Sequence, residues 1–379
     1  GIAMSGSASQ AVAVTALNVR NMRQRFASSI VALIGIAGVV TVLVGVLSIR
    51  EGFRAALDYS GSPDIAIVLR GGSSDELSSG FGQDQARIIM DSEHIARGAD
   101  GPIASAELYV IVDVPLKSTG TAANVPFRGV GQNAPKLRDN FRIVEGRMFV
   151  PGTFEVIVGA GAAEEFQGMV VGNTVRWGTT DWTIVGRFED KGSVSESEVW
   201  TDATVLQGAY NRGNSYQSIR AKLTSADALT AFKDSLSNDP RVNTKVYSEK
   251  AFYEEQSEGL RAMITGLGFG VALLMGLGAV FAALNTMYSA VSARTREIAT
   301  LRALGFGSLP VVISVIAEAL LLALVGSIVG MLISYFAFNG IRASTINFGS
   351  FRQLSFAFTV TTDLLLQGLI YALVLGFIG

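Results

Sequence analysis

The sequence predicts a membrane α-helical protein with four transmembrane helices and a large α+β extracytoplasmic domain inserted between helices 1 and 2. The chain is 49% hydrophobic and only 16% charged, against roughly 25% charged for an average soluble domain. Long uncharged runs recur along it. All of the acidic residues except Glu297, Glu318 and Asp363 lie between Arg50 and Arg261, so the middle of the chain has the composition of a soluble domain.

The uncharged runs predict the four spans. About 20 apolar residues are needed to cross the hydrocarbon core of a bilayer as a helix. The predicted spans are residues 28–49, 263–291, 311–338 and 364–379. The last run is short for a complete crossing, so we expect it to be truncated.

Basic residues predict the orientation, because short cytoplasmic loops carry an excess of Lys and Arg. Segments 1–27 and 292–310 are both basic, so both are predicted to be cytoplasmic. Four crossings then place 50–262 and the short loop 339–363 outside. The predicted localisation is the cytoplasmic (inner) membrane, multi-pass. Within 1–27, the helical recurrence of apolar residues predicts either an amphipathic helix on the cytoplasmic leaflet or a cytoplasmic extension of the first span.

The large loop 50–262 combines β-rich runs with helical stretches. Alternation and β-branched residues predict strands at 64–69, 106–114, 125–130, 155–158, 173–177, 182–188 and 218–223. Helices are predicted at 83–91, 225–237 and 248–262. No helix breaker occurs in 51–59 or 250–262, so we expect helical stalks that continue into the first and second spans.

Composition and motifs exclude several classes of function. The chain has no cysteine and one histidine, His94, which we expect at the surface, so thiolate metal sites and thiol nucleophiles are excluded. No phosphate-binding G-x-x-x-x-G-K-[ST] sequence occurs, and residues 159–165, GAGAAEE, predict a strand-to-helix turn. The pI of about 5.7 gives no basic surface for nucleic acid. We expect no catalytic, metal or cofactor site on this chain.

The segment 292–308 has the pattern of a short amphipathic cytoplasmic helix. Apolar residues recur at helical spacing among charges, and glycines end it. Such a helix can dock in a groove of a soluble partner, with its charges fixing the register; alternatively, its arginines only anchor the topology. The candidate coupling residues are Arg294, Arg296, Glu297, Leu301, Arg302 and Gly305.

Two polar residues lie within predicted spans. Glu318 interrupts the third span, and an ionisable group inside a bilayer is costly, which makes a functional role the default hypothesis. The alternative is structural: Glu318 would accept hydrogen bonds from Asn285, Ser289 or a loop arginine and fix helix packing. Gly326 and Gly330 have the small-xxx-small spacing that allows close helix approach.

Three segments resemble one family. Residues 285–312, NTMYSAVSARTREIATLRALGFGSLPVV, and 313–334, ISVIAEALLLALVGSIVGMLIS, resemble the FtsX-like permease domain of MacB- and LolCE-type ABC transporters. Residues 145–188, which begin with EGRMF, are similar to the periplasmic core domain of the same permeases. The basic segment before the first span also fits, so the resemblance covers nearly the whole chain.

The resemblance implies a non-catalytic permease subunit. Two permeases, identical or different, would pair over a cytoplasmic ABC ATPase dimer on separate chains, which binds the ATP and Mg²⁺. Residues 293–304 would form the coupling helix, and Glu318 would match the acidic position of the family's third span. ATP hydrolysis would move the extracytoplasmic domain, which exports or extracts substrate, with a periplasmic adaptor or substrate protein as a possible partner. The alternative is an FtsX-like or sensor-type permease that regulates an extracytoplasmic partner without transport; a membrane-anchored enzyme is disfavoured.

Overall fold

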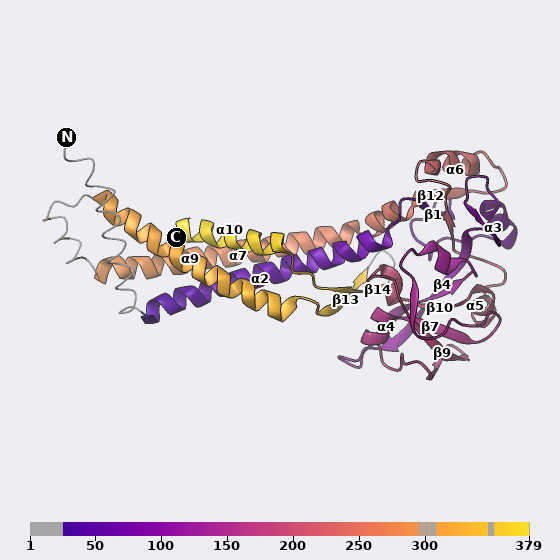
Figure 1. The fold of residues 1–379 in the computed structure, drawn as a ribbon, viewed down its shortest axis with the longest axis horizontal. Coiled ribbons are helices and arrows are strands. Elements are labelled where there is room, and N and C mark those ends of the chain that lie inside the picture. The colour runs from indigo at the N-terminus through magenta and orange to yellow at the C-terminus, as the bar shows by residue number, and fades with distance from the viewer. Residues whose placement is uncertain are drawn as a thin grey trace. The chain divides into compact units, whose positions relative to one another are not determined.

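The computed structural model describes residues 26–293, 295, 299, 303, 308–347 and 352–378 (Figure 1). The chain divides into two compact units. The helical unit comprises Gly1–Glu51, Met263–Ile341 and Phe358–Gly379. The sheet unit comprises Gly52–Ala262 and Arg342–Ala357.

Four helices account for the predicted spans. They are α2 (Phe26–Ser60), α7 (Glu249–Ala293), α9 (Ser308–Phe338) and α10 (Thr362–Ile378). Stretches of three of them are long and apolar enough to cross a membrane: Ile30–Ser60, Arg261–Gly278 and Val315–Phe338. Helix α10 has 17 residues, fewer than the roughly 20 that a full crossing needs. Three of the four predicted spans therefore have the required length among the described residues.

Small residues set the packing of α9 against α2 in the helical unit. A Cβ atom on Gly330 would lie 2.7 Å from the carbonyl oxygen of Ala37 and 2.9 Å from Cβ of Val40, and one on Gly326 would lie 3.0 Å from Cβ of Ile36. No larger side chain fits there without moving the helices apart. The predicted small-xxx-small contact is thus confirmed.

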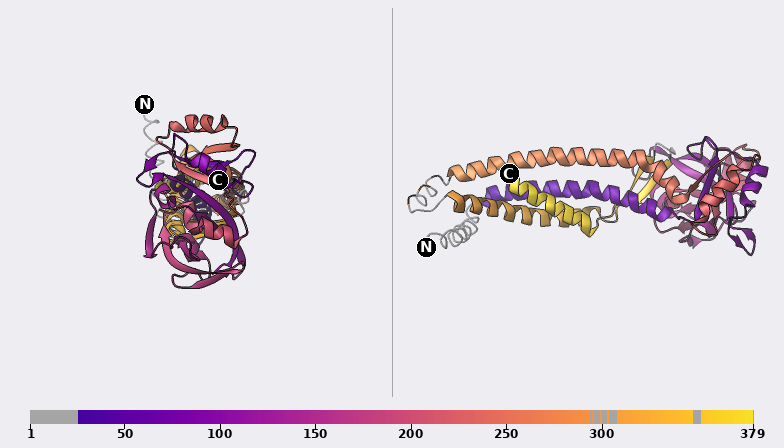
Figure 2. Two further views of the ribbon diagram at one scale, coloured as in Figure 1. Left: turned by 90° about the vertical axis from the view of Figure 1, so that its right-hand side faces the viewer. Right: turned by 90° about the horizontal axis from the view of Figure 1, so that it is seen from above.

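Helix α10 packs on the same helices and also contacts α7. A Cβ atom on Gly368 would lie 3.0 Å from a methyl group of Val44 on α2. The Tyr371 hydroxyl donates a 2.6 Å hydrogen bond to the carbonyl oxygen of Ala272 on α7. Figure 2 shows α10 running beside α9. Helix α7 itself is mostly exposed in this unit, with 11% of its span buried.

The sheet unit is built on a mixed ten-stranded sheet, as expected for an α+β domain. Its order is β12-β1-β11-β4-β5-β10-β7-β9-β6, and β8 pairs with β9. The strands are β1 (Ile65–Arg70), β4 (Ala104–Pro115), β5 (Ala122–Val130), β6 (Arg142–Gly146), β7 (Glu155–Gly159), β8 (Thr174–Trp177), β9 (Thr180–Glu189), β10 (Val199–Asp202), β11 (Ser218–Lys222) and β12 (Thr244–Ser248). The helices are α3 (Gln83–Met90), α4 (Ala160–Glu165), α5 (Ala203–Ala209) and α6 (Ala228–Ser237), with the 3₁₀ turns η2 (Ala134–Leu137) and η3 (Val194–Ser197).

Strand β4 belongs to both halves of this sheet. Its residues 104–107 pair antiparallel with β11, and its residues 108–115 pair antiparallel with β5. One half of the sheet, with α3 and α6, packs a core around Phe232 and Ile89; the other, with α4 and α5, packs a larger one. The long strand therefore ties the two cores together.

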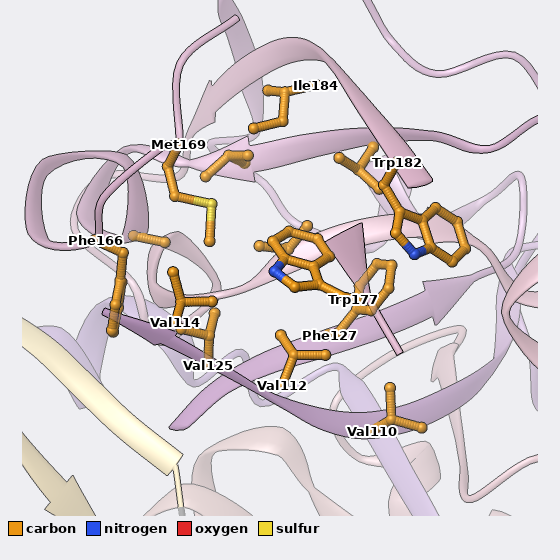
Figure 3. Packing of buried hydrophobic residues seen from close by; sticks show 14 of the residues in the cluster. Val110, Val112, Val114, Val125, Phe127, Phe166, Met169, Trp177, Trp182 and Ile184 are labelled. Atoms are coloured by element: carbon orange, nitrogen blue, oxygen red, sulfur yellow. The ribbon is translucent and has the colours of Figure 1, made fainter. Parts of the chain in front are cut away.

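Aromatic side chains fill the larger core (Figure 3). The ring of Phe127 meets those of Trp177 and Trp182 edge-on, at centroid distances of 5.2 and 4.9 Å. Val112, Val125 and their neighbours close around them. All three tryptophans of the chain, these two and Trp200, are buried in the sheet unit.

Most of the predicted elements are present with small shifts at their ends. All seven predicted strands and the three predicted helices occur, 159–165 is a strand-to-helix turn, and both stalks are continuous with the helices of the spans. Strands β6, β10 and β12 and helix α5 were not predicted. The loop 339–363 contains a hairpin, β13 (Arg342–Asn347) with β14 (Arg352–Ala357), which belongs to the sheet unit. The short pair β2 (Arg97–Gly98) and β3 (Gly101–Pro102) was also missed.

Candidate functional site

The predicted coupling residues lie outside the described residues. These are Arg294, Arg296, Glu297, Leu301, Arg302 and Gly305. The amphipathic N-terminal segment lies outside them as well, apart from its last two residues. Asn285 occupies a helical position within α7. The coupling site therefore stays a prediction from the sequence.

Glu318 lies on α9 inside the apolar stretch Val315–Phe338 and is 8% exposed. It lies almost three turns into that helix, about 15 Å from Ser308 at a rise of 1.5 Å per residue. Its side chain is thus covered within the helical unit, as expected for an ionisable group that faces a bundle interior.

A cluster of seven charged side chains is buried in the sheet unit and was not predicted. It joins strands β4, β5 and β11, the segments beside η2 and β10, the segment after β1, and the first residue of α7. We name it the ion network; it comprises Glu76, Glu107, Arg128, Arg138, Glu198, Arg220 and Glu249. Every member is at most 9% exposed.

Arg128 is the centre of the ion network. Its guanidinium binds Glu76 through two bonds of 2.7 and 3.0 Å and Glu198 through two bonds of 2.9 and 2.8 Å. It also donates to Glu107 at 3.0 Å and lies 4.9 Å from the ring centroid of Tyr109. Arginine suits this position because its planar fork makes paired bonds with carboxylates.

Glu107 connects the other two arginines to Arg128. It accepts from Arg138 at 3.1 Å and from Nε of Arg220 at 3.0 Å. Arg220 continues to Glu249 and donates to the Tyr253 hydroxyl at 3.1 Å. Glu249 and Tyr253 belong to the first turns of α7, so the network fixes this stalk helix to the sheet.

The arginines hold two carboxylates ionised. Burial by itself would raise the pKa of Glu76, but Arg128 and Arg220 lower it far below its ordinary value. Burial would likewise raise the pKa of Glu107, but Arg138, Arg220 and Arg128 together lower it below its ordinary value. Glu249 behaves differently, because burial dominates and raises its pKa to about 7.

Both stalk helices reach the sheet at one place, which we name the stalk junction and define as Ser60, Gly61, Ser62, Glu249 and Lys250. The Ser62 amide donates to Glu249 at 3.3 Å. A Cβ atom on Gly61 would lie 2.8 Å from Cα of Lys250, so the end of α2 and the start of α7 touch there. Ser60 in turn accepts a 2.6 Å hydrogen bond from the amide of Val194.

The charged side chains of the network pair with one another. Among residues 26–293, 308–347 and 352–378, no group of three or more His, Cys, Asp or Glu side chains is arranged to hold a metal ion. The sequence did carry a signal for the network. Arg128 interrupts a predicted strand that is otherwise apolar, and Glu107 and Arg220 also lie within predicted strands. A charge on a buried strand requires a buried partner.

Comparison with known proteins identifies the family. Residues 29–239 match the family described as MacB-like periplasmic core domain, which covers more than half of the chain. Residues 269–379 match the FtsX-like permease C-terminal family. The chain belongs to the MacB-type, FtsX-like family of ABC transporter permeases. The resemblance stated from the sequence is confirmed.

Two relatives within this MacB-type family are macrolide export ATP-binding/permease proteins. The protein MacB 1 of Aeromonas hydrophila is 23% identical over 325 residues, which cover 80% of this chain and 48% of that protein. MacB of Bordetella avium is 22% identical over 368 residues, which cover 92% and 54%. The chain thus spans about half the length of these relatives.

Two solved structures are similar over about half of the chain. The extracellular domain of the noncanonic ABC-type transporter YknZ from Gram-positive bacteria is 13% identical, covering 48% of this chain and 99% of that one, with a TM-score of 0.36. The periplasmic region of MacB from Actinobacillus actinomycetemcomitans is 13% identical, covering 53% and 96%, with a TM-score of 0.39.

Proposed function

We propose that this protein is the permease subunit of an ABC transporter and transmits ATP-driven movement to its sheet unit. The sheet unit lies outside the cytoplasmic membrane in this proposal. Cytoplasmic ATPase subunits bind ATP and Mg²⁺ and act on residues 293–304. This chain then needs no catalytic group of its own, because a ligand shifts an equilibrium through its different affinities for two arrangements.

The observation that carries the proposal is the continuity of the two stalk helices. Helix α2 runs unbroken from Phe26 to Ser60, and α7 runs unbroken from Glu249 to Ala293. Each belongs to the helical unit over one stretch and to the sheet unit over another. A continuous helix carries displacement along its axis, and the ion network holds the end of α7 on the sheet.

The exposed face of α7 supports pairing with a second permease. Its large apolar side chains are open to the surroundings in the single chain, with exposed fractions of 63% for Leu267, 71% for Phe269 and 71% for Leu274. Close contact between membrane helices depends on packing and on small residues. On the same helix, no atom lies within 4 Å of the position that a Cβ atom would take on Gly266 or Gly270. A partner helix therefore has room to approach.

A macrolide is the leading candidate for the exported substrate. The two curated relatives carry macrolide export in their names. A regulatory permease that acts on an extracytoplasmic partner, without transport, is the second candidate. A periplasmic adaptor is a further expected partner in the first case.

The test is co-purification of the chain from membranes with an ATPase subunit, followed by ATP hydrolysis assays of the complex in lipid nanodiscs. We expect Arg296→Glu and Arg302→Glu to leave insertion intact and to change the hydrolysis rate of the bound ATPase severalfold. Arg20→Glu is the matched control, because it reverses a charge in the other predicted cytoplasmic segment. Equal hydrolysis in all variants would refute the coupling assignment, and failure to recover any ATPase would refute the transporter proposal.

A further inference from the structure

The ion network, which includes Glu249 of the stalk junction, contains one carboxylate more than its arginines can neutralise. The ion network has four glutamates and three arginines, a formal charge of −1 among side chains that are at most 9% exposed. Ionised buried groups are stable only when they are paired and hydrogen-bonded. One glutamate of the network is therefore poorly compensated.

Glu249 is that glutamate. Arg220 is its direct ionic partner, but Arg220 also bonds Glu107 at 3.0 Å and lies 3.9 Å from Glu76. By contrast, Glu76 and Glu198 each hold both oxygens on Arg128. Glu249 receives only one arginine contact, which is shared, and the 3.3 Å bond from the Ser62 amide.

The groups around Glu249 complete this description. The positive charge of Arg138, which follows η2, lowers the pKa of Glu249. The negative charge of Asp190, which follows β9, raises it. Tyr253 lies one turn further along α7 and is bonded to Arg220. Asp190 is itself 4% exposed and is held by the hydroxyl groups of Ser193 and Ser195. Glu249 is thus acted on by two positive charges, Arg220 and Arg138, and by one further negative charge, Asp190.

We propose that Glu249 is a proton-binding site that holds the stalk junction closed when protonated and loosens it when ionised. The proposal goes beyond the proposed function and does not depend on it. In the closed junction the carboxyl is buried between Arg220 and Ser62. Opening exposes it to water, where the ionised form is well solvated. Loss of the proton therefore favours the open arrangement of the ends of α2 and α7.

Burial raises the pKa of Glu249 from its ordinary value of 4.5 to about 7, against the opposing effect of Arg220. The sign follows from linkage. Between these two values the closed form holds a proton that the open or unfolded form has lost, so stability is greatest at low pH and falls as pH rises toward 7. Above that range both forms are ionised and the dependence ends. Burial also raises the pKa of Asp190 above its ordinary value of 3.8. Asp190 therefore also makes the closed form less stable as the pH rises above that value.

The experiment follows backbone hydrogen exchange of the full chain in detergent between pH 5.5 and 8.5. The reporter is the peptide containing the Ser62 amide, with rates corrected for the intrinsic effect of pH. We expect the opening constant of wild type to rise by up to about tenfold per pH unit up to pH 7 and then to level off. Glu249→Gln, which keeps the shape without the titration, should show no such rise.

Glu258→Gln is the matched control, because Glu258 is an exposed carboxylate further along α7. It should retain the wild-type profile. A wild-type profile that is flat across the range would overturn the proposal without any variant, which covers the case that Glu249→Gln does not fold. A rise that persists unchanged in Glu249→Gln would also overturn it and would point to Asp190 instead.

Discussion

Glu107 supports the ion network more than any other carboxylate, because it alone bonds all three arginines. It is fully buried and accepts bonds of 3.0 Å from Arg128, 3.1 Å from Arg138 and 3.0 Å from Arg220. In Glu107→Gln the charge is lost, and the new amide directs hydrogen toward guanidinium groups. The three buried arginines keep three carboxylate partners, but each loses its ionic hydrogen bond to residue 107.

The expected cost is about 3–5 kcal/mol, the range for removing one partner of a buried ion pair. For a domain of this size, a loss of about 1 kcal/mol lowers the unfolding midpoint by roughly 2–4 °C. We therefore expect the midpoint of Glu107→Gln to fall on the order of 10 °C.

Tryptophan fluorescence of the full chain in detergent measures this directly. All three tryptophans lie in the sheet unit, and Trp200 donates a 2.9 Å hydrogen bond to Glu198 of the network. Asp181→Asn is the matched control, because Asp181 is 60% exposed in a 3.4 Å pair with Arg176 and such pairs contribute little. If Glu107→Gln melts within about 2 °C of Asp181→Asn, the reasoning about the network is refuted.

Three further outcomes are expected. Gly330→Ala should lower the midpoint of helix loss in circular dichroism, because its Cβ would meet the carbonyl oxygen of Ala37 at 2.7 Å. A cysteine at Leu274, 71% exposed on α7, should form a disulfide-linked dimer in oxidised membranes; the chain has no other thiol. Below about pH 4 the tryptophan-detected midpoint should fall, because the lowered pKa values of Glu76 and Glu107 make their stabilisation present at neutral pH and lost on acidification.

Each of these outcomes has a control. Gly278→Ala places its Cβ in open space and should melt at or above the wild-type temperature, and an equal loss in both glycine variants would contradict the packing argument. A cysteine at Leu366 of α10, 53% exposed, tests whether cross-linking is specific to α7. In Glu107→Gln the fall on acidification should be smaller than in wild type.

Patterns that depend on local order were read correctly from the sequence. Uncharged runs gave three helices of spanning length, alternation gave the seven predicted strands, and the spacing of Gly326 and Gly330 indicated the close approach of α9 to α2. These features rest on the chemistry of neighbouring residues. Strands such as β10 and β12 were missed because each is short, and each is recognisable mainly by its partners in the sheet.

The ion network could not be predicted from spacing. Glu76 and Glu249 are far apart along the chain, and both lie beside Arg220 of β11. A charged residue within an apolar strand shows that a partner is required, but it does not say which one. Similarly, the hairpin of β13 and β14 joins the sheet unit from the loop after α9, a relation that no local pattern contains.

The length of β4 determines how the sheet unit responds to a pull along its strands. Its first residues bond to β11 and its later residues to β5, through consecutive pairs such as Glu107 with Ser218 and Leu108 with Gly129. A force along β4 would load these hydrogen bonds in shear, all at once, rather than opening them one after another. A slip by a single residue would also turn Glu107 away from its arginines and toward the opposite face. The two cores are therefore expected to travel together as a single body when the stalks move.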